Sequence, residues 1–196
     1  MKENNTKQLI LTTAYEMISC QGYDKTSIGQ IADKVGIKKA SIYYYFNSKE
    51  EIFIELVKLM YNSDATFIKE AMNEKINSKE EYLNNLIHMG ELLIDSCYQD
   101  LCSKKFSAEV DIQTTRIPEI KSLISDLELN CVKLIEEYLT NGIKLGYLPE
   151  DTKIVNSAQL LYTIFIGIDS AILYDLPVNC IEVWKDVAKN IVYRKE

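Results

Sequence analysis

A short segment near the N-terminus brings basic, hydroxyl and aromatic side chains together at helical spacing. Lys38, Ser41 and Tyr44 recur every three residues, which places them on one face of a helix, with Lys39 and Ala40 beside them. Lysine can donate to guanine O6 and N7, serine can pair with several base edges, and an apolar edge can meet a thymine methyl. This segment therefore has the chemistry of a surface that reads base pairs.

The surrounding residues predict two short helices joined by a tight turn. Ser27 followed by Gln30 forms a capping box, with Thr26 as a rival cap, and opens the first helix. Gly36 permits a turn, because glycine tolerates positive φ, and a second helix is predicted from about 38 to 45. In a helix-turn-helix the second helix enters the major groove of DNA and the first crosses the backbone.

Polar side chains that border this face suit contacts with phosphate, which position a protein on DNA without reading sequence. They are the hydroxyls of Thr26, Ser27 and Tyr43 and the ammonium of Lys49. Four residues point the other way and are predicted to pack into the small core of the hairpin: Ile37, Ile42, Tyr45 and Phe46. A packed helical hairpin without DNA contact is the alternative, since aromatic residues at helical spacing are usually core.

The composition predicts an all-α fold. The chain has 196 residues, 47 % of them hydrophobic, with only seven glycines and three prolines. Low glycine and proline favour long helices over a turn-rich β fold. We expect about nine helices and no strand: an N-terminal three-helix DNA-binding domain over residues 1–47 and a larger helical domain over 48–196.

Charge is distributed unevenly along the chain. Residues 1–47 hold six lysines and arginines against four acidic residues, a net charge of +2, whereas residues 48–196 hold sixteen against twenty-five, a net charge of −9. The overall net charge of −7 excludes a non-specific nucleic-acid coat. The positive charge lies in the segment that carries the helix-turn-helix pattern.

Several classes of protein are disfavoured by what the sequence lacks. There is no nucleophile with a base, no phosphate loop and no metal-ligand spacing, so we expect neither an enzyme nor a cofactor or metal. No secretory signal is found, and the longest apolar stretch, interrupted by Asp169, is interpreted as a buried core helix and not a membrane span. Five widely spaced cysteines indicate reduced thiols and a cytoplasmic protein; Cys97 and Cys102 leave a redox pair as an alternative.

Residues 26–53, "TSIGQIADKVGIKKASIYYYFNSKEEIF", closely resemble the signature of TetR-family transcriptional regulators. The resemblance covers about 45 residues at the N-terminus. This chain departs from the family pattern at Lys38, Ala40 and Tyr44, which face the bases, so the operator cannot be inferred from relatives. Asn47 also replaces a common proline, which loosens the turn.

The resemblance implies a ligand-responsive dimeric regulator, most commonly a repressor. Its N-terminal domain would bind a palindromic double-stranded DNA operator through residues 26–49. Its C-terminal domain would form a homodimer and bind a small-molecule effector that releases the DNA. A helical regulator that acts by binding another protein, with a vestigial DNA-binding head, is the competing interpretation.

Two further sets of residues are predicted from helix faces and from this resemblance. Polar and aromatic residues on inner faces are candidates for ligand contact: His88, Tyr138, Tyr162, Phe165 and Asp169. Apolar residues of the last two helices are candidates for the dimer interface, with packing inside the monomer as the alternative for about half of them: Leu161, Ile164, Ile168, Trp184, Val187 and Ile191.

Overall fold

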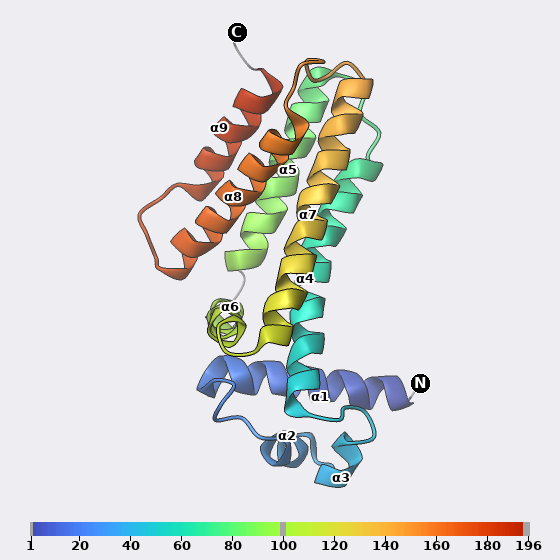
Figure 1. Cartoon of the computed structure of the whole chain (residues 1–196), viewed down its shortest axis with the longest axis vertical. Helices are drawn as coiled ribbons and strands as arrows, with labels where there is room; N and C mark the ends of the chain where they lie inside the picture. The colour runs from blue at the N-terminus through green and yellow to red at the C-terminus, as the bar shows by residue number, and fades with distance from the viewer. Residues whose placement is uncertain (1, 99–100, 194–196) are drawn as a thin grey trace. The chain divides into compact units, whose positions relative to one another are not determined.

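The fold is entirely helical in the part of the chain that the computed structural model describes, residues 2–98 and 101–193. Nine helices and no strand are found within these residues, which confirms the predicted all-α class (Figure 1). In chain order the helices are α1 (Lys2–Gln21), α2 (Ile28–Val35), α3 (Lys39–Ile42), α4 (Lys49–Asn73), α5 (Lys79–Tyr98), α6 (Leu101–Thr114), α7 (Pro118–Lys144), α8 (Ile154–Leu173) and α9 (Cys180–Val192).

These helices form two compact units. The head unit comprises Met1–Tyr61 and Asp100–Ile124, and the body unit comprises Asn62–Gln99 and Ser125–Glu196. The boundaries fall inside α4 and α7, so each of these helices contributes to both units. The predicted division into domains 1–47 and 48–196 stays a prediction.

The hairpin of α2 and α3 is defined by its caps. The Ser27 hydroxyl accepts from the Gln30 backbone N–H, and the Gln30 side chain accepts from the Ser27 backbone N–H, which is the predicted capping box. Gly36 ends α2 at φ 79°, in the left-handed region that favours glycine. Helix α3 is shorter than predicted, because residues 43–45 continue as a turn.

Helices α4 and α5 begin with the same pentapeptide, Asn-Ser-Lys-Glu-Glu, and the same cap. The Ser48 hydroxyl accepts from the Glu51 N–H at 3.0 Å, while the Glu51 carboxylate accepts from the Asn47 N–H. The second copy repeats both bonds, through Ser78 and Glu81. In each copy a side-chain oxygen satisfies a backbone donor of the first turn, which fixes where the helix starts.

The core of the head unit is aromatic and includes α6. Phe106 of α6 lies 5.1 Å from the Tyr15 ring and 5.4 Å from the Phe53 ring, centroid to centroid. Tyr23 contacts Phe53 at 4.9 Å. Because these rings come from α1, α4, α6 and the loop after α1, α6 is a structural part of the head unit.

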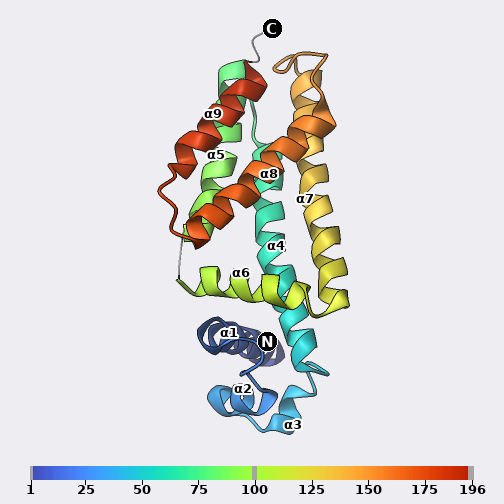
Figure 2. The ribbon, with the colours of Figure 1, turned by 60° about the vertical axis from the view of Figure 1, so that its left-hand side comes forward.

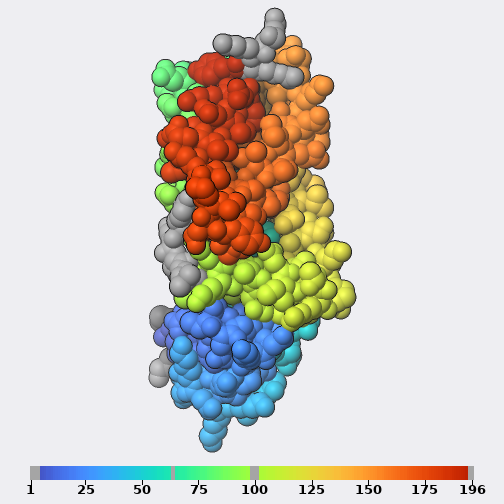
Figure 3. Space-filling model, turned by 90° about the vertical axis from the view of Figure 1, so that its left-hand side faces the viewer, coloured from blue at the N-terminus to red at the C-terminus, as the bar shows by residue number. Residues whose placement is uncertain are grey.

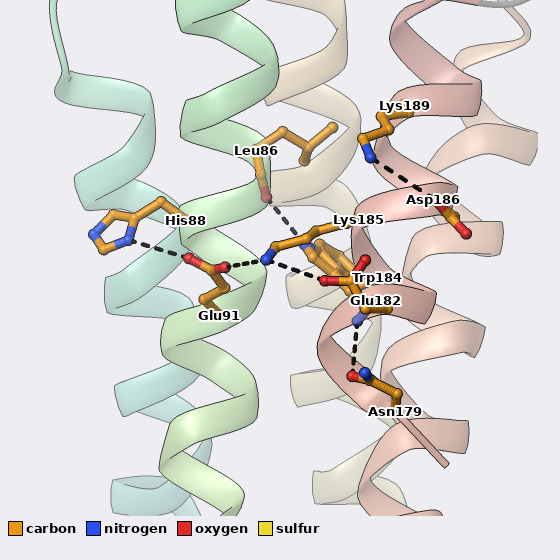
Figure 4. Close-up of polar contacts among 9 residues, drawn as sticks. All are labelled: Leu86, His88, Glu91, Asn179, Glu182, Trp184, Lys185, Asp186 and Lys189. Atoms are coloured by element: carbon orange, nitrogen blue, oxygen red, sulfur yellow. Dashed lines mark hydrogen bonds and ion pairs between the residues drawn. The ribbon is translucent and has the colours of Figure 1, made fainter.

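In the body unit, α5, α8 and α9 lie side by side (Figures 1 and 2). The indole N–H of Trp184 on α9 donates to the Leu86 carbonyl on α5 at 3.2 Å, in a fully buried position. At the surface, the Lys185 ammonium reaches the Glu91 carboxylate at 3.4 Å (Figure 4). The α5–α9 contact therefore combines one buried hydrogen bond with a solvated ion pair.

Helix α8 is buried on one face only. By length and composition it is the one helix among the described residues apolar enough to cross a membrane, with a mean hydropathy of 1.2, although core helices meet the same criterion. Only 22 % of that apolar window is buried inside the monomer. The prediction of a buried core helix is therefore right for one face of α8 and wrong for the other.

Candidate nucleic-acid interface

The predicted reading segment is exposed as one surface. Its outward side chains, Lys38, Lys39, Ala40, Ser41 and Tyr44, are all exposed. On the opposite face, two residues are almost fully buried: Ile42 and Phe46. The short helix α3 is thus fixed by two apolar anchors while its polar face is left to solvent.

The three consecutive tyrosines lie in three different environments. Tyr44 is 71 % exposed and Tyr43 is 47 % exposed, so both side chains lie at the surface. Tyr45 is half-buried, and its ring meets the Tyr44 ring edge to face at 5.0 Å. Tyr45 therefore supports the ring of Tyr44 at the outermost point of the segment.

Thr26 is buried, which corrects its predicted role as a phosphate ligand. Only 1 % of its surface is exposed, and its hydroxyl donates to the Gly22 carbonyl at 2.9 Å. The same hydroxyl accepts from the Gln21 side chain at 3.3 Å. Thr26 holds the α1–α2 loop together, whereas the neighbouring Ser27 is exposed and carries the cap.

Lys49 is engaged inside the head unit. Its ammonium donates to the Tyr23 carbonyl at 2.6 Å and lies 3.9 Å from the centroid of the Tyr23 ring. Burial lowers the pKa of this ammonium below its ordinary value, an effect opposed by the carboxylates of Asp24 and Glu109. If Lys49 also contacts a phosphate, its ammonium must bind the phosphate and the Tyr23 carbonyl at the same time or leave the carbonyl.

An ion pair ties the α1–α2 loop to the segment after α6. The Arg116 guanidinium lies 2.7 Å from the Asp24 carboxylate, across 92 positions of sequence. Both side chains are more than half exposed, so the pair adds little stability by itself. It places a positive charge beside the Asp24 carboxylate in the loop between α1 and α2.

A short capped helix, a glycine turn and a short second helix with an exposed basic and aromatic face define a helix-turn-helix DNA-binding protein. Residues 10–56 match the family described as "Bacterial regulatory proteins, tetR family". The chain is also 32 % identical over 159 residues to IcaR of Staphylococcus aureus strain Newman, the "Biofilm operon icaADBC HTH-type negative transcriptional regulator", covering 74 % of this chain and 75 % of IcaR. The chain belongs to the TetR family of transcriptional regulators and is not an enzyme.

Two other similarities agree with this assignment. The "Fatty acid metabolism regulator protein" of Bacillus subtilis strain 168 is 24 % identical over 166 residues, covering 83 % of this chain and 81 % of that protein. The structure of FadR from Bacillus subtilis in complex with stearoyl-CoA superposes with a TM-score of 0.71 at 21 % identity. It covers 96 % of this chain and 99 % of that one, and it shows the shared fold.

The predicted ligand residues do not form one site. Tyr162 and Phe165 line an apolar cavity in the body unit, together with Ile68, Met89, Leu93, Cys131, Ile135, Leu161 and Trp184. His88 is exposed on α5, with its Nδ1 atom 4.0 Å from the Glu91 carboxylate (Figure 4), so it faces solvent and not a cavity. Asp169 is half-buried one helical turn beyond Phe165.

Tyr138 belongs to a separate buried network. Its hydroxyl donates to the Asn85 side-chain oxygen at 2.8 Å, and the Asn85 amide donates to the Glu74 carboxylate at 2.7 Å. The Tyr138 ring stacks on Tyr82 at 4.9 Å. Burial raises the pKa of both phenols well above the ordinary value, so they remain neutral hydrogen-bonding groups. Tyr138 therefore joins helices and does not line the cavity.

Four of the six predicted dimer residues pack inside the monomer. This is the alternative that the sequence analysis gave for about half of them. Leu161, Ile168, Trp184 and Ile191 are at most 8 % exposed and lie in the body core, so they offer a partner almost no surface. Ile164 and Val187 are half-buried at its edge. Four apolar residues on the same two helices, which the sequence analysis did not single out, are exposed: Val155, Leu160, Ile166 and Val183.

Proposed function

We propose that this regulator is a repressor that binds a palindromic operator as a homodimer and releases it when a small molecule enters the body unit. The observation that carries the DNA-binding part is the exposure of Lys38, Ser41 and Tyr44 on a helix whose other face is held by Ile42 and Phe46. Repression is supported by the negative regulation described for IcaR.

The homodimer is proposed to form through the outer face of α8 and α9. Leu160 and Ile166 of α8 and Val183 of α9 are each more than a third exposed. In the space-filling view, α8 and α9 (orange to red) form much of the visible surface of the body unit (Figure 3). Gly167 leaves open space where a side chain would stand, so a partner helix can approach closely at that point. Exposed apolar side chains on two adjacent helices favour an interaction site, because large exposed apolar patches are uncommon on a monomer. A dimer would separate the two reading heads by about one DNA turn, roughly 34–36 Å.

Release of DNA is proposed to act through α4. Ile68, on the second half of α4, lines the cavity, and Phe53, on the first half of the same continuous helix, belongs to the head core. A ligand that fills the cavity displaces Ile68 and favours a different position of α4. The ligand can lower the affinity for DNA at most by the factor by which it prefers that conformation over the DNA-binding one. The stearoyl-CoA bound to FadR of Bacillus subtilis supports small-molecule control of this kind.

Selection of genomic DNA fragments with purified full-length protein tests this proposal. We expect enrichment of a palindromic sequence, and we expect Ser41→Ala and Tyr44→Ala to change the preferred bases. Lys133→Ala, an exposed lysine in the body unit, serves as the matched surface control and should select the same sequence as the wild type. Enrichment of no sequence by the wild-type protein would refute operator binding.

A further inference from the structure

A carboxylate, that of Asp169, stands one helical turn beyond the lining of the apolar cavity. Leu93 of α5 and Phe165 of α8 both line the cavity. Four residues later on each helix stand Cys97 and Asp169, which form a side-chain hydrogen bond with each other. Because four residues are about one turn, roughly 6 Å of helix axis, this pair lies one turn beyond the lining residues on both helices.

Asp169 is not neutralised by a cation in the described part of the chain. The thiol of Cys97 is its polar contact there, and no lysine, arginine or histidine contributes to its electrostatic environment. Burial raises the pKa of Asp169 above its ordinary value, and the Cys97 hydrogen bond offsets only part of that increase. A half-buried carboxylate in an apolar helix is costly when no positive charge compensates it.

The remainder of the cavity supplies apolar and aromatic surface. Three aromatic residues line it, Tyr162, Phe165 and Trp184, and the rest of the lining is aliphatic or sulfur-containing. The Trp184 N–H is already committed to the Leu86 carbonyl, so the indole offers the cavity its ring and not its donor. Aromatic faces attract cations within about 6 Å of the ring centroid.

We infer that the effector is an organic cation with an apolar body, which inserts the body between α5 and α8 and places its positive group against Asp169. This inference rests on the proposed function, since it names the chemical class of the ligand that would fill the same cavity. An anionic ligand would bring a second negative charge beside a carboxylate for which the described residues supply no cation.

The cavity must open to admit such a ligand. In the structure it has room for the centre of a water-sized sphere over only about 10 Å³, which is the space of about one water molecule. Tyr162 and Phe165 are half-buried and stand at its edge on α8. We expect these two rings to move away from α5 and so open a path from the apolar lining toward Asp169.

Three ligands with the same ten-carbon chain distinguish the effect of charge on binding from the effect of the apolar chain. They are decyltrimethylammonium, decanol and decanoate, each used below the concentration at which it forms micelles. We expect the cation to raise the melting temperature of the full-length dimer most, because a ligand that binds only the folded state stabilises it. Asp169→Asn should lower the affinity for the cation by about tenfold, measured by calorimetric titration. The affinity for decanol should not change. Asp186→Asn, at an exposed carboxylate on α9, is the matched control and should behave as the wild type.

Other outcomes would overturn the inference. Equal or tighter binding of decanol or decanoate, or unchanged cation affinity in Asp169→Asn, would remove the carboxylate from ligand recognition. Absence of binding by all three would also refute the cationic class. Operator binding measured on the same samples without ligand keeps these results separate from the proposed function, which fails only if no operator is bound or if no small molecule releases it.

Discussion

The indole of Trp184 lies directly on the backbone of Gly90, so close that a Cβ atom on that glycine would stand 1.8 Å from the indole nitrogen. Gly90→Ala therefore forces the buried ring or helix α5 to move. We expect a loss of about 3 kcal/mol in the free energy of unfolding, at the upper end of overpacking costs, measured by urea denaturation. Gly29→Ala is the control, because its Cβ would meet only the Ser27 hydroxyl at 3.9 Å. Equal stability of the two variants would contradict this account of the α5–α9 contact.

Lys39 is exposed on the reading segment and forms no ion pair in the described part of the chain. Lys39→Ala should weaken operator binding and reduce the slope of log affinity against log salt by about one, which corresponds to one lost phosphate contact. Fluorescence anisotropy at several salt concentrations measures this slope. A weaker affinity with an unchanged slope would mean that Lys39 does not meet a phosphate.

Thr26 should affect folding and not DNA affinity. Thr26→Val keeps the buried shape but loses the hydroxyl that donates to the Gly22 carbonyl, which should cost about 1 kcal/mol of stability. Thr26→Ser retains the hydroxyl and should recover most of the loss in thermal denaturation. Operator affinity of the folded Thr26→Val protein should equal that of the wild type. A selective loss of DNA binding at unchanged stability would restore the phosphate contact predicted from the sequence.

The buried phenol of Tyr23 links the stability of the head unit to alkaline pH. Burial, assisted by the carboxylates of Glu50 and Asp24, raises the pKa of Tyr23 from 10.0 to about 12. The unfolded chain therefore releases this proton first, and the free energy of unfolding falls as the pH rises between those two values. Tyr23→Phe has no such proton and should lose less stability over the same window in urea titrations. Parallel curves for both proteins would disprove the link.

Ile166 is 44 % exposed on the outer face of α8. Ile166→Lys should convert the proposed dimer into a monomer, because it places a charge where an apolar contact would be desolvated. Sedimentation velocity measures the change. Leu129→Lys, at a 55 % exposed leucine on α7, is the matched control and should sediment as the wild type. A monomeric wild type, or dissociation by both variants, would argue against the α8–α9 interface.

Local signals explain why the helices and turns could be predicted. The caps at Ser27 and Ser48 and the turn at Gly36 depend on residues within a few positions, and all three were found where the sequence placed them. Thr26 shows the limit of such signals. A threonine next to a serine offers the same hydroxyl, and only the tertiary fold decides that Thr26 is buried while Ser27 is exposed.

Contacts between distant segments were beyond prediction. Trp184 was assigned to a dimer surface because it lies on an apolar helix face, but helix periodicity does not tell which partner covers that face. Here Gly90, 94 positions earlier in the sequence, provides the space that the indole fills. His88 was likewise assigned to an inner face of its helix from periodicity alone. In the structure His88 is exposed, and its neighbour Met89 on α5 is buried instead.

The aromatic cluster of the head unit determines how a chimeric regulator could be built. A reading head excised after residue 47 would leave Tyr23 without Phe53 and Tyr15 without Phe106, so it would lose the aromatic contacts of its core. A functional graft must carry the first half of α4 together with α6, two segments separated by about forty residues of sequence. Transplanting DNA specificity into or out of this protein is therefore better done by exchanging the exposed residues of the reading segment than by fusing whole domains.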